Sequence, residues 1–183
     1  MHHEAIEELK TIKDYIRYSI SRFLDANLCF GHGIESPTEE AIELVLGALK
    51  LPRDLDSFFF DSIITSSERK AVIDMLQQRV VKRIPLAYLT NEALFAGYSF
   101  YVDERVLVPR SPIAELIDTG FQPWFCDREP TRILDLCTGS GCIAIACAYA
   151  FPDSQVDAID ISADALEVAK INIERHGAET LVH

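Results

Sequence analysis

Residues 132–144 have the sequence RILDLCTGSGCIA, in which a short apolar run passes through a small-residue loop into a second apolar segment. The first run contains Asp135, and the loop contains two glycines. This pattern is typical of a strand that turns tightly into a helix, so that backbone N–H groups at the helix N-terminus face a bound cofactor. Asp160 follows the next apolar run, 156–159, where a carboxylate is placed to accept hydrogen bonds from ribose hydroxyls. The sequence therefore predicts a nucleotide-type cofactor site.

The order of elements after residue 130 predicts an α/β fold with a parallel, doubly wound sheet. Strands are expected at 132–136 and 155–159, and helices at 142–150 and 162–177, the second of which begins at a serine cap and ends at a glycine. Strand–helix alternation gives parallel strands joined by right-handed crossovers. Residues 180–182 resemble the start of a third strand. Because two strands and a fragment cannot make a sheet that buries both faces, we expect a truncated Rossmann-like domain in the front part of a longer protein.

Helical periodicity dominates the first ninety residues. Apolar residues recur every three or four positions between Ile6 and Phe23, which predicts one amphipathic helix of about twenty residues. Ser36 and Thr65 each open a capping-box sequence, so each predicts the start of a further helix. The aromatic run 58–60 is either a docking patch or part of the core of this helical bundle, and the core is the prediction.

After residue 93 the hydrophobic period changes from helical to strand-like. Apolar residues over 94–102 and 106–108 flank Asp103-Glu104-Arg105, which predicts a β-hairpin with its turn at these three residues. The predicted domains are a helical bundle over 1–92, a β-hairpin linker over 93–110 and a partial Rossmann-like domain over 111–183.

The formal net charge is −12 and is unevenly distributed. Residues 1–93 carry 11 basic and 15 acidic side chains, and residues 94–183 carry 6 and 14. An acidic protein repels phosphate backbones, so we expect no direct binding to nucleic acid. The same charge either attracts a basic protein partner or serves only solubility.

The sequence shows no membrane, disulfide or metal signal. No apolar run approaches the ~20 residues of a membrane span, and the N-terminus is acidic where a secretory signal would be basic, so we expect a cytoplasmic protein. The five cysteines form no CxxC pair and no cluster with histidine at metal-ligand spacing. We therefore expect reduced thiols and no metal site.

The glycine loop is compatible with more than one cofactor. Residues 139–144 satisfy the dinucleotide pattern GxGxxA, which is a weak signal by itself. Asp135 stands four places before Gly139, whereas in dinucleotide enzymes the first glycine follows the strand almost directly. A carboxylate there suits a cofactor with an ammonium group and no pyrophosphate, which favours S-adenosylmethionine over a nicotinamide or flavin cofactor. The competing interpretation of Asp135 is a carboxylate that caps the loop amides, and it does not exclude binding.

Several segments, in the expected order, resemble the HemK family of protein glutamine methyltransferases. They are RIPLAYL at 83–89, FAGYSF at 95–100, VLVPR at 106–110, DLCTGSGC at 135–142, and Asp160-Ile161-Ser162 with Ala165, Leu166, Ala169 and Asn172. The resemblance covers residues 83–177, with a helical domain of the expected size before it.

The resemblance implies transfer of a methyl group from S-adenosylmethionine to the side-chain amide nitrogen of a glutamine, with the helical domain over 1–92 recognising the substrate. Ser111-Pro112-Ile113 and Cys137 are similar to the branch that acts on large-subunit ribosomal protein three. The release-factor branch usually has Pro-Glu-Thr and glycine at these places. A cysteine in the loop also predicts that position 137 lies outside the positive-φ region.

The resemblance implies a cofactor set of Asp135, Cys137, Thr138, Gly139, Ser140, Gly141 and Asp160. The family holds the acceptor amide with an Asn-Pro-Pro-Tyr loop, which does not occur in the sequence, so we expect no catalytic residue here and no turnover by this chain alone. Phe100 and Arg110 are expected either at the mouth of the active site or, respectively, in the hairpin core and in an ion pair. His32 and His176 are expected to be loop and helix-end residues.

Three alternative functions remain open at this point: a peptide chain release factor glutamine methyltransferase, a nicotinamide-dependent oxidoreductase, and a non-catalytic binding module.

Overall fold

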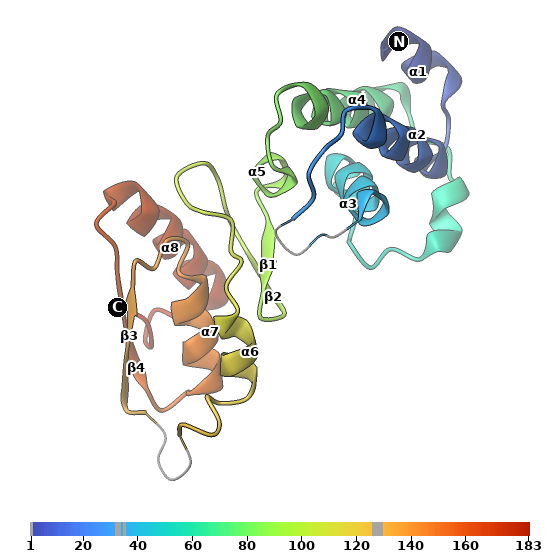
Figure 1. Ribbon diagram of the computed structural model, residues 1–183. Helices are drawn as coiled ribbons and strands as arrows, with labels where there is room; N and C mark the ends of the chain where they lie inside the picture. The colour runs from blue at the N-terminus through green and yellow to red at the C-terminus, as the bar shows by residue number, and fades with distance from the viewer. Residues whose placement is uncertain (1, 32–33, 35, 126–129) are drawn as a thin grey trace. The chain divides into compact units, whose positions relative to one another are not determined.

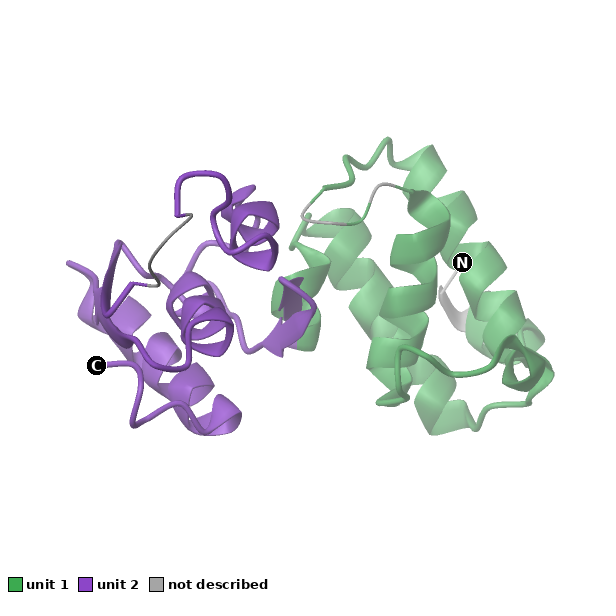
Figure 2. Cartoon of the chain, turned by 90° about the horizontal axis from the view of Figure 1, so that it is seen from below, with its two compact units in different colours: residues 1–90 green, residues 91–183 purple. Residues whose placement is uncertain are grey.

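The computed structural model describes residues 2–31, 34, 36–125 and 130–183 (Figure 1). The chain forms two compact units, residues 1–90 and residues 91–183 (Figure 2). Among the described residues, no helix has both the length and the apolar character needed to cross a membrane.

The first unit is the predicted helical bundle. Its elements are α1 (His2–Glu8), α2 (Ile12–Asp25), α3 (Pro37–Leu49), the 3-10 helix η1 (Ser57–Asp61), α4 (Ser66–Val81) and α5 (Leu86–Thr90). Their apolar faces meet in one core, in which Tyr15, Phe23, Leu44 and Val72 are fully buried.

The single helix predicted between Ile6 and Phe23 is wrong, because the chain forms two helices there. Thr11 begins α2 with a capping box: its hydroxyl accepts from the Asp14 amide at 3.1 Å, and the Asp14 carboxylate accepts from the Thr11 amide at 2.9 Å. These local bonds compete with continuation of the helix. Thr11 also forms a β-bridge with Ile63, which holds the break in place.

The two predicted capping residues are confirmed. The Ser36 hydroxyl accepts from the Glu39 amide at 3.2 Å at the start of α3. The Thr65 hydroxyl accepts from the Glu68 amide at 3.4 Å, and the Glu68 carboxylate accepts from the Thr65 amide at 2.7 Å. Such bonds satisfy amide donors at the helix start that have no partner within the helix.

The prediction that the aromatic run 58–60 belongs to the core is wrong for its first two residues. Phe58 is 81% exposed and Phe59 is 49% exposed, while Phe60 packs against the bundle core. A five-residue 3-10 helix has three residues per turn, so only one of three consecutive side chains can point inward.

The hairpin of the second unit lies earlier than predicted. Strands β1 (Ala93–Phe95) and β2 (Tyr98–Phe100) pair antiparallel, so the turn is at Ala96-Gly97 and not at residues 103–105. Both turn residues have positive φ, 48° and 79°, as a two-residue type I′ turn requires. Residues 103–105 instead form a local turn in which the Asp103 carboxylate accepts from Arg105, and no described strand follows over 106–108.

The predicted parallel sheet is confirmed, with the predicted bounds. Strands β3 (Arg132–Leu136) and β4 (Gln155–Ile159) pair in parallel over their whole length, from Arg132 opposite Gln155 to Leu136 opposite Ile159. Helix α7 (Cys142–Ala150) connects them, α8 (Ala163–His176) follows, and α6 (Ile113–Asp118) precedes them. Val182 bridges to Val156 in parallel on the other side of β4, as expected for the start of a third strand.

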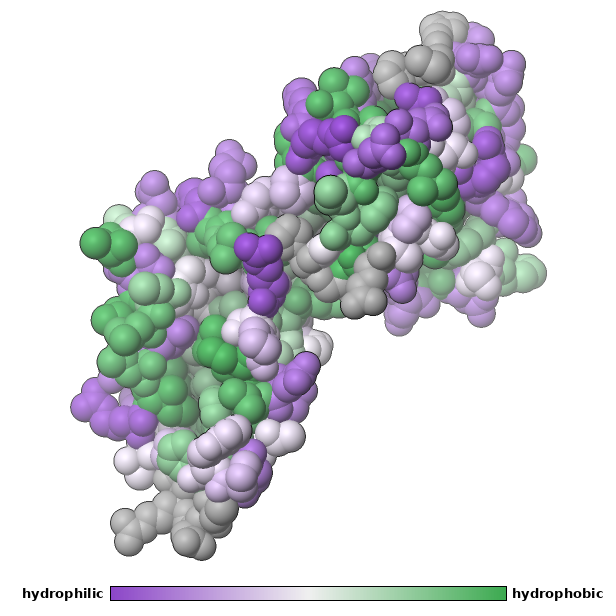
Figure 3. All heavy atoms as spheres, viewed as in Figure 1, coloured by the Kyte–Doolittle hydropathy of each residue, from purple (hydrophilic) through white to green (hydrophobic). Residues whose placement is uncertain are grey.

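The two faces of this sheet differ in burial. Ile133, Asp135 and Val156 point toward the helices, and the core of this unit also contains Phe95 and Phe100 from the hairpin. On the opposite face Leu134, Leu136 and Ile159 are at least half exposed, and Figure 3 shows hydrophobic residues on the side of the unit where β3 and β4 lie. The predicted α/β class with an N-terminal helical bundle is confirmed.

Candidate functional site

The loop between β3 and α7 reverses the chain through three positive-φ residues. Cys137, Gly139 and Gly141 have φ values of 62°, 56° and 79°. The prediction that Cys137 lies outside the positive-φ region is therefore wrong. The left-handed conformation costs a residue with a Cβ atom only ~1–2 kcal/mol, and the tight reversal at the strand end imposes it here. The Thr138 amide donates to the Ile159 carbonyl at 3.0 Å, which ties the loop to the end of β4.

Asp135 anchors the loop to the helix that follows it. Its side chain is buried, and its Oδ2 accepts from the Thr138 hydroxyl at 2.7 Å and from the Ala144 amide at 3.2 Å. Helix α7 has Gly141 as N-cap and so lacks a capping side chain of its own; Asp135 supplies that acceptor from the neighbouring strand. Asp135 thus acts as a cap, as one interpretation predicted, but the amide that it caps lies in the first turn of α7 and not in the loop. Burial raises the pKa of this carboxyl, while the bonds from Thr138 and Ala144 act in the opposite direction.

Asp160 joins the ends of both strands. One carboxylate oxygen accepts from the Gly139 amide at 2.9 Å, and the other accepts from the Ser162 amide at 2.9 Å. These backbone bonds, that from Ser162 first and that from Gly139 next, lower the pKa of Asp160, so the side chain is an anion at neutral pH. Asp135 and Asp160 therefore lie at the carboxyl ends of adjacent parallel strands, the position where open α/β sheets bind ligands.

All seven residues of the predicted cofactor set come together in this loop and at the start of the segment after β4. These residues differ in how far their side chains are exposed to solvent. Thr138 and Ser140 are buried, so their side chains serve the interior of the loop. Gly139 faces open space, since a Cβ atom built there would meet no atom within 4 Å. The ligand-accessible part of the loop is therefore its backbone at Gly139, flanked by exposed Cys137 and by Asp160.

Asn172 supports the glycine loop, a role that the sequence did not indicate. It is fully buried on α8, and its amide nitrogen donates to the carbonyl oxygens of Ser140, at 2.8 Å, and Tyr101, at 2.9 Å. Its amide oxygen accepts from the Tyr101 amide at 2.7 Å. One side chain thus connects the glycine loop, α8 and the segment after the hairpin. The available signal was a polar residue at a position that continues the apolar spacing of Ala165, Val168 and Ala169.

Gly141 permits close packing of α7 on α8. A Cβ atom at this position would lie 3.3 Å from the Cβ atom of Ala169, and its φ of 79° also disfavours a side chain. The sequence therefore needs glycine at 141 for two independent reasons.

Phe100 and Arg110 are not brought to the loop by any contact in the described residues. Phe100 is fully buried and stacks on His176 with ring centroids 4.7 Å apart, which agrees with the core interpretation. Arg110 is exposed. His176 ends α8, where its ring contacts the Tyr149 hydroxyl and the Ser99 carbonyl, each at 2.9 Å. His32 lies outside the described residues.

Comparison with known proteins agrees with this geometry. The family model described as methyltransferase small domain matches residues 122–183, which contain the loop and both carboxylates. A ribosomal protein uL3 glutamine methyltransferase of Bordetella pertussis is 51% identical over 174 residues, which cover 94% of this chain and 58% of that protein. A second, of Neisseria gonorrhoeae, is 48% identical over 180 residues, covering 98% and 60%.

The chain spans about three fifths of the length of these curated relatives. Methyltransferases of this kind use S-adenosylmethionine as methyl donor. Residues 122–183 match the methyltransferase small domain and fold as a Rossmann-like α/β unit, and the chain is similar over most of its length to the two uL3 glutamine methyltransferases.

Proposed function

We propose that this chain is the cofactor-binding part of an S-adenosylmethionine-dependent methyltransferase that modifies the side-chain amide of a glutamine. The observation that carries the proposal is the pair of carboxylates around one glycine loop: Asp160 bonds the Gly139 amide, and Asp135 bonds Thr138 and the Ala144 amide of α7. The similarity to uL3 glutamine methyltransferases, at 51% and 48% identity, supports the same reaction class.

The residues present fit this cofactor. Each carboxylate oxygen of Asp160 accepts one described hydrogen bond, and such an oxygen has room for a second, from a ribose hydroxyl. The Oδ1 oxygen of Asp135 accepts no hydrogen bond from the described residues and is available to an ammonium group, directly or through water. The open space beside Gly139 lets the ligand approach the backbone. Bound S-adenosylmethionine would supply the electrophilic methyl group of its sulfonium.

The contribution of this chain to the reaction is binding and orientation. An amide nitrogen is a poor nucleophile, because its lone pair is delocalised into the carbonyl, so the methyl donor must be held in line with it. Asp135, Asp160 and the loop between them form a rigid frame for the donor, since both carboxylates are already bonded to the backbone. The Asn-Pro-Pro-Tyr loop that would hold the acceptor amide does not occur among the 183 residues. The proposal therefore assigns no residue of this chain to binding the glutamine that receives the methyl group.

The proposed substrate is a glutamine of large-subunit ribosomal protein uL3, the protein that appears in the names of the relatives. A net charge of −12 favours encounter with a basic protein over binding to naked nucleic acid. In this proposal the helical domain over 1–92 recognises the substrate, the segment over 93–110, which begins with the β1–β2 hairpin, links it to the methyltransferase part over 111–183, and the protein acts in the cytoplasm.

Calorimetric titration with S-adenosylmethionine tests the cofactor assignment. Asp160→Asn removes the charge that orders the loop and accepts from the ribose, so we expect affinity to fall at least about tenfold. The matched control is Asp153→Asn, in an exposed turn before β4, and its affinity should equal that of the original chain. A nicotinamide cofactor that binds while S-adenosylmethionine does not would contradict the proposal.

The substrate assignment needs a separate experiment. The full-length protein, incubated with radiolabelled S-adenosylmethionine, should label purified uL3 and not purified release factors. Labelling of release factors alone would overturn the choice of substrate and leave the cofactor assignment intact.

A further inference from the structure

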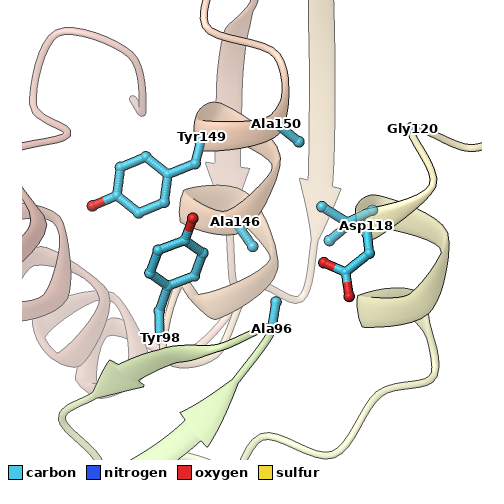
Figure 4. A pocket seen from close by; sticks show the side chains of 8 residues that line it. Ala96, Tyr98, Asp118, Gly120, Ala146, Tyr149 and Ala150 are labelled. Carbon is cyan, nitrogen blue, oxygen red and sulfur yellow. The ribbon is translucent and has the colours of Figure 1, made fainter.

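The second unit contains a cavity that the proposed methyl transfer does not use. Its volume is 370 Å³, within the range of small-ligand sites, and it lies between the β1–β2 turn, the end of α6 and the last two turns of α7 (Figure 4). The residues that line it include Ala96, Tyr98, Asp118, Ala146, Tyr149 and Ala150. None of them belongs to the glycine loop.

The cavity has one charged wall and one aromatic wall. Figure 4 shows Asp118 on one side and the rings of Tyr98 and Tyr149 on the other, with Ala146 between them. The two rings have centroids 4.8 Å apart. Tyr149 is held in place by hydrogen bonds between its hydroxyl and the ring and carbonyl of His176, at 2.9 and 3.0 Å, so the aromatic wall is ordered before any ligand arrives.

Two polar groups at this cavity lack partners among the described residues. The carboxylate of Asp118 makes no ion pair or hydrogen bond there, and the hydroxyl of Tyr98 makes no hydrogen bond there. Asp118 is also the last residue of α6, where the negative end of the helix disfavours a second negative charge. Both side chains are exposed, so water solvates them in the free chain, and a bound cation would add an ion pair with Asp118 that also offsets its unfavourable place on the helix.

The chemistry of the walls selects among cations. A guanidinium is planar, stacks on aromatic faces, and donates several hydrogen bonds in one plane, which suits a tyrosine face opposite a carboxylate. The methyl groups of Ala96, Ala146 and Ala150 offer apolar contact for the methylene stem of the side chain. A free polyamine carries several charges, whereas Asp118 is the only carboxylate among the described residues that line the cavity.

We propose that this cavity binds an arginine side chain of a protein partner, with its guanidinium between Asp118 and the Tyr98–Tyr149 pair. The acidic balance of residues 94–183, which carry 6 basic and 14 acidic side chains, favours the approach of such a partner. The site is separate from the proposed donor site, because no described lining residue belongs to the glycine loop or hydrogen-bonds to Asp135 or Asp160.

The probe for the test is N-acetyl-arginine methylamide, titrated into the full chain with isotope-labelled tyrosine rings and followed by NMR. Its matched neutral analogue, N-acetyl-citrulline methylamide, has the same shape without the charge. We expect the arginine probe to shift the ring signals of Tyr98 and Tyr149 saturably, and the citrulline probe to bind about tenfold more weakly or worse. Tyr98→Phe and Tyr149→Phe assign the two signals.

Asp118→Asn should weaken the arginine probe about tenfold, and raised salt should weaken it in the original chain. The control is Glu115→Gln, an exposed carboxylate one turn earlier on α6 that does not line the cavity, and it should leave binding unchanged. If Asp118→Asn fails to fold, Tyr98→Phe decides the question, because it removes only the unpaired hydroxyl and should weaken binding about threefold.

Equal affinity for the arginine and citrulline probes, or no loss in either variant, would overturn the proposal. An N-acetyl-lysine probe as tight as the arginine probe would overturn the choice of a guanidinium. Spermidine binding more tightly than the arginine probe would overturn the assignment to a protein partner.

Discussion

Cys137 shows how weakly residue type alone constrains one backbone angle. A cysteine in place of a glycine predicted a negative φ, yet its φ is 62° because the loop must reverse direction between β3 and α7. The cost of ~1–2 kcal/mol is small against the hydrogen bonds that the same loop makes through Thr138 and Asp160. The residue tolerates this backbone geometry without favouring it.

This strain predicts that Cys137→Gly raises the free energy of unfolding, by up to about 1 kcal/mol, because glycine adopts positive φ without strain. Urea unfolding of the chain measures the change. The control is Cys29→Gly, at another exposed cysteine that is not among the positive-φ residues, and it should lower the free energy of unfolding. Equal effects at both positions would contradict the backbone explanation.

The two site carboxylates respond to pH in opposite directions. The pKa of Asp160 is lowered, so its contribution to stability is present above its unfolded pKa and is lost as pH falls through the folded pKa. The pKa of Asp135 is raised in the folded chain, so the unfolded chain ionises this carboxyl at a lower pH than the folded chain does. The free energy of unfolding therefore falls as pH rises through the interval between the unfolded and folded pKa values.

Asp160→Asn is therefore expected to lower the free energy of unfolding at pH 7 and to have little effect at a pH below the folded pKa of Asp160, where the carboxyl is protonated in both the folded and the unfolded chain. Denaturant titrations at the two pH values measure this difference. Asp153→Asn serves again as control, with no such pH dependence expected. A loss of the same size at both pH values would mean that the charge of Asp160 does not order the loop.

At the scale of elements, neighbouring segments supply the hydrogen-bond partners that a helix or loop does not find within itself. Helix α7 begins at Gly141, which has no side chain to cap it, and the capping acceptor comes from Asp135 on β3. Asn172 on α8 likewise bonds the carbonyl of Ser140 in the glycine loop and both backbone groups of Tyr101. The position of the glycine loop thus depends on β3 and α8, and Asn172 also ties α8 to the segment at Tyr101.

Asn172→Ala should lower the free energy of unfolding by at least about 2 kcal/mol, because it leaves three buried or half-buried backbone groups without their partner. Hydrogen exchange adds a specific readout, since the Tyr101 amide should exchange faster in this variant. Lys170→Ala, an exposed change on the same helix, should alter stability by no more than about 0.5 kcal/mol. A Tyr101 amide that exchanges as slowly in the variant as in the original chain would argue against the hydrogen bond from Tyr101 to Asn172 as the source of its protection.

At the scale of the whole molecule, the second unit buries two thiols in the core next to the glycine loop. Burial raises the pKa values of Cys142 and Cys147 to about 11, so almost no thiolate is present at neutral pH. Cys29 and Cys137 are exposed. Because the thiolate is the reactive form, the four described cysteines should divide into two classes.

Iodoacetamide at about pH 8 should alkylate Cys29 and Cys137 first, and Cys142 and Cys147 only when the second unit unfolds. Mass spectrometry of proteolytic peptides over time measures the four rates. Saturating S-adenosylmethionine should slow the buried class further, because a ligand of the folded state reduces opening. Rapid labelling of Cys142 in the folded chain would contradict the burial.

Much of the second unit was predictable, because its signals are local. The bounds of β3, α7 and β4 follow from apolar runs separated by turn residues, and Ser162 and Gly177 delimit α8 as expected. The hairpin was misplaced, since the apolar residues over 94–102 continue through its turn and only Gly97 marks it. The break before α2 was missed because Thr11 and Asp14 interrupt the helix without interrupting its apolar spacing.

The sequence by itself determined the element order, the glycine loop and the pair of carboxylates at 135 and 160, because these depend on residue types at short spacing. Only the tertiary structure decided what the carboxylates bond to, the left-handed backbone at Cys137, the exposure of Phe58 and the clamp made by Asn172. It also brought Tyr98, Asp118 and Tyr149 together around one cavity. The bonds of Asn172 and the cavity arise from contacts between residues far apart in the chain, about which the hydrophobic period of one segment carries no information. The φ of Cys137 and the exposure of Phe58 follow from the geometry of a tight reversal and of a 3-10 helix, which apolar spacing does not specify either.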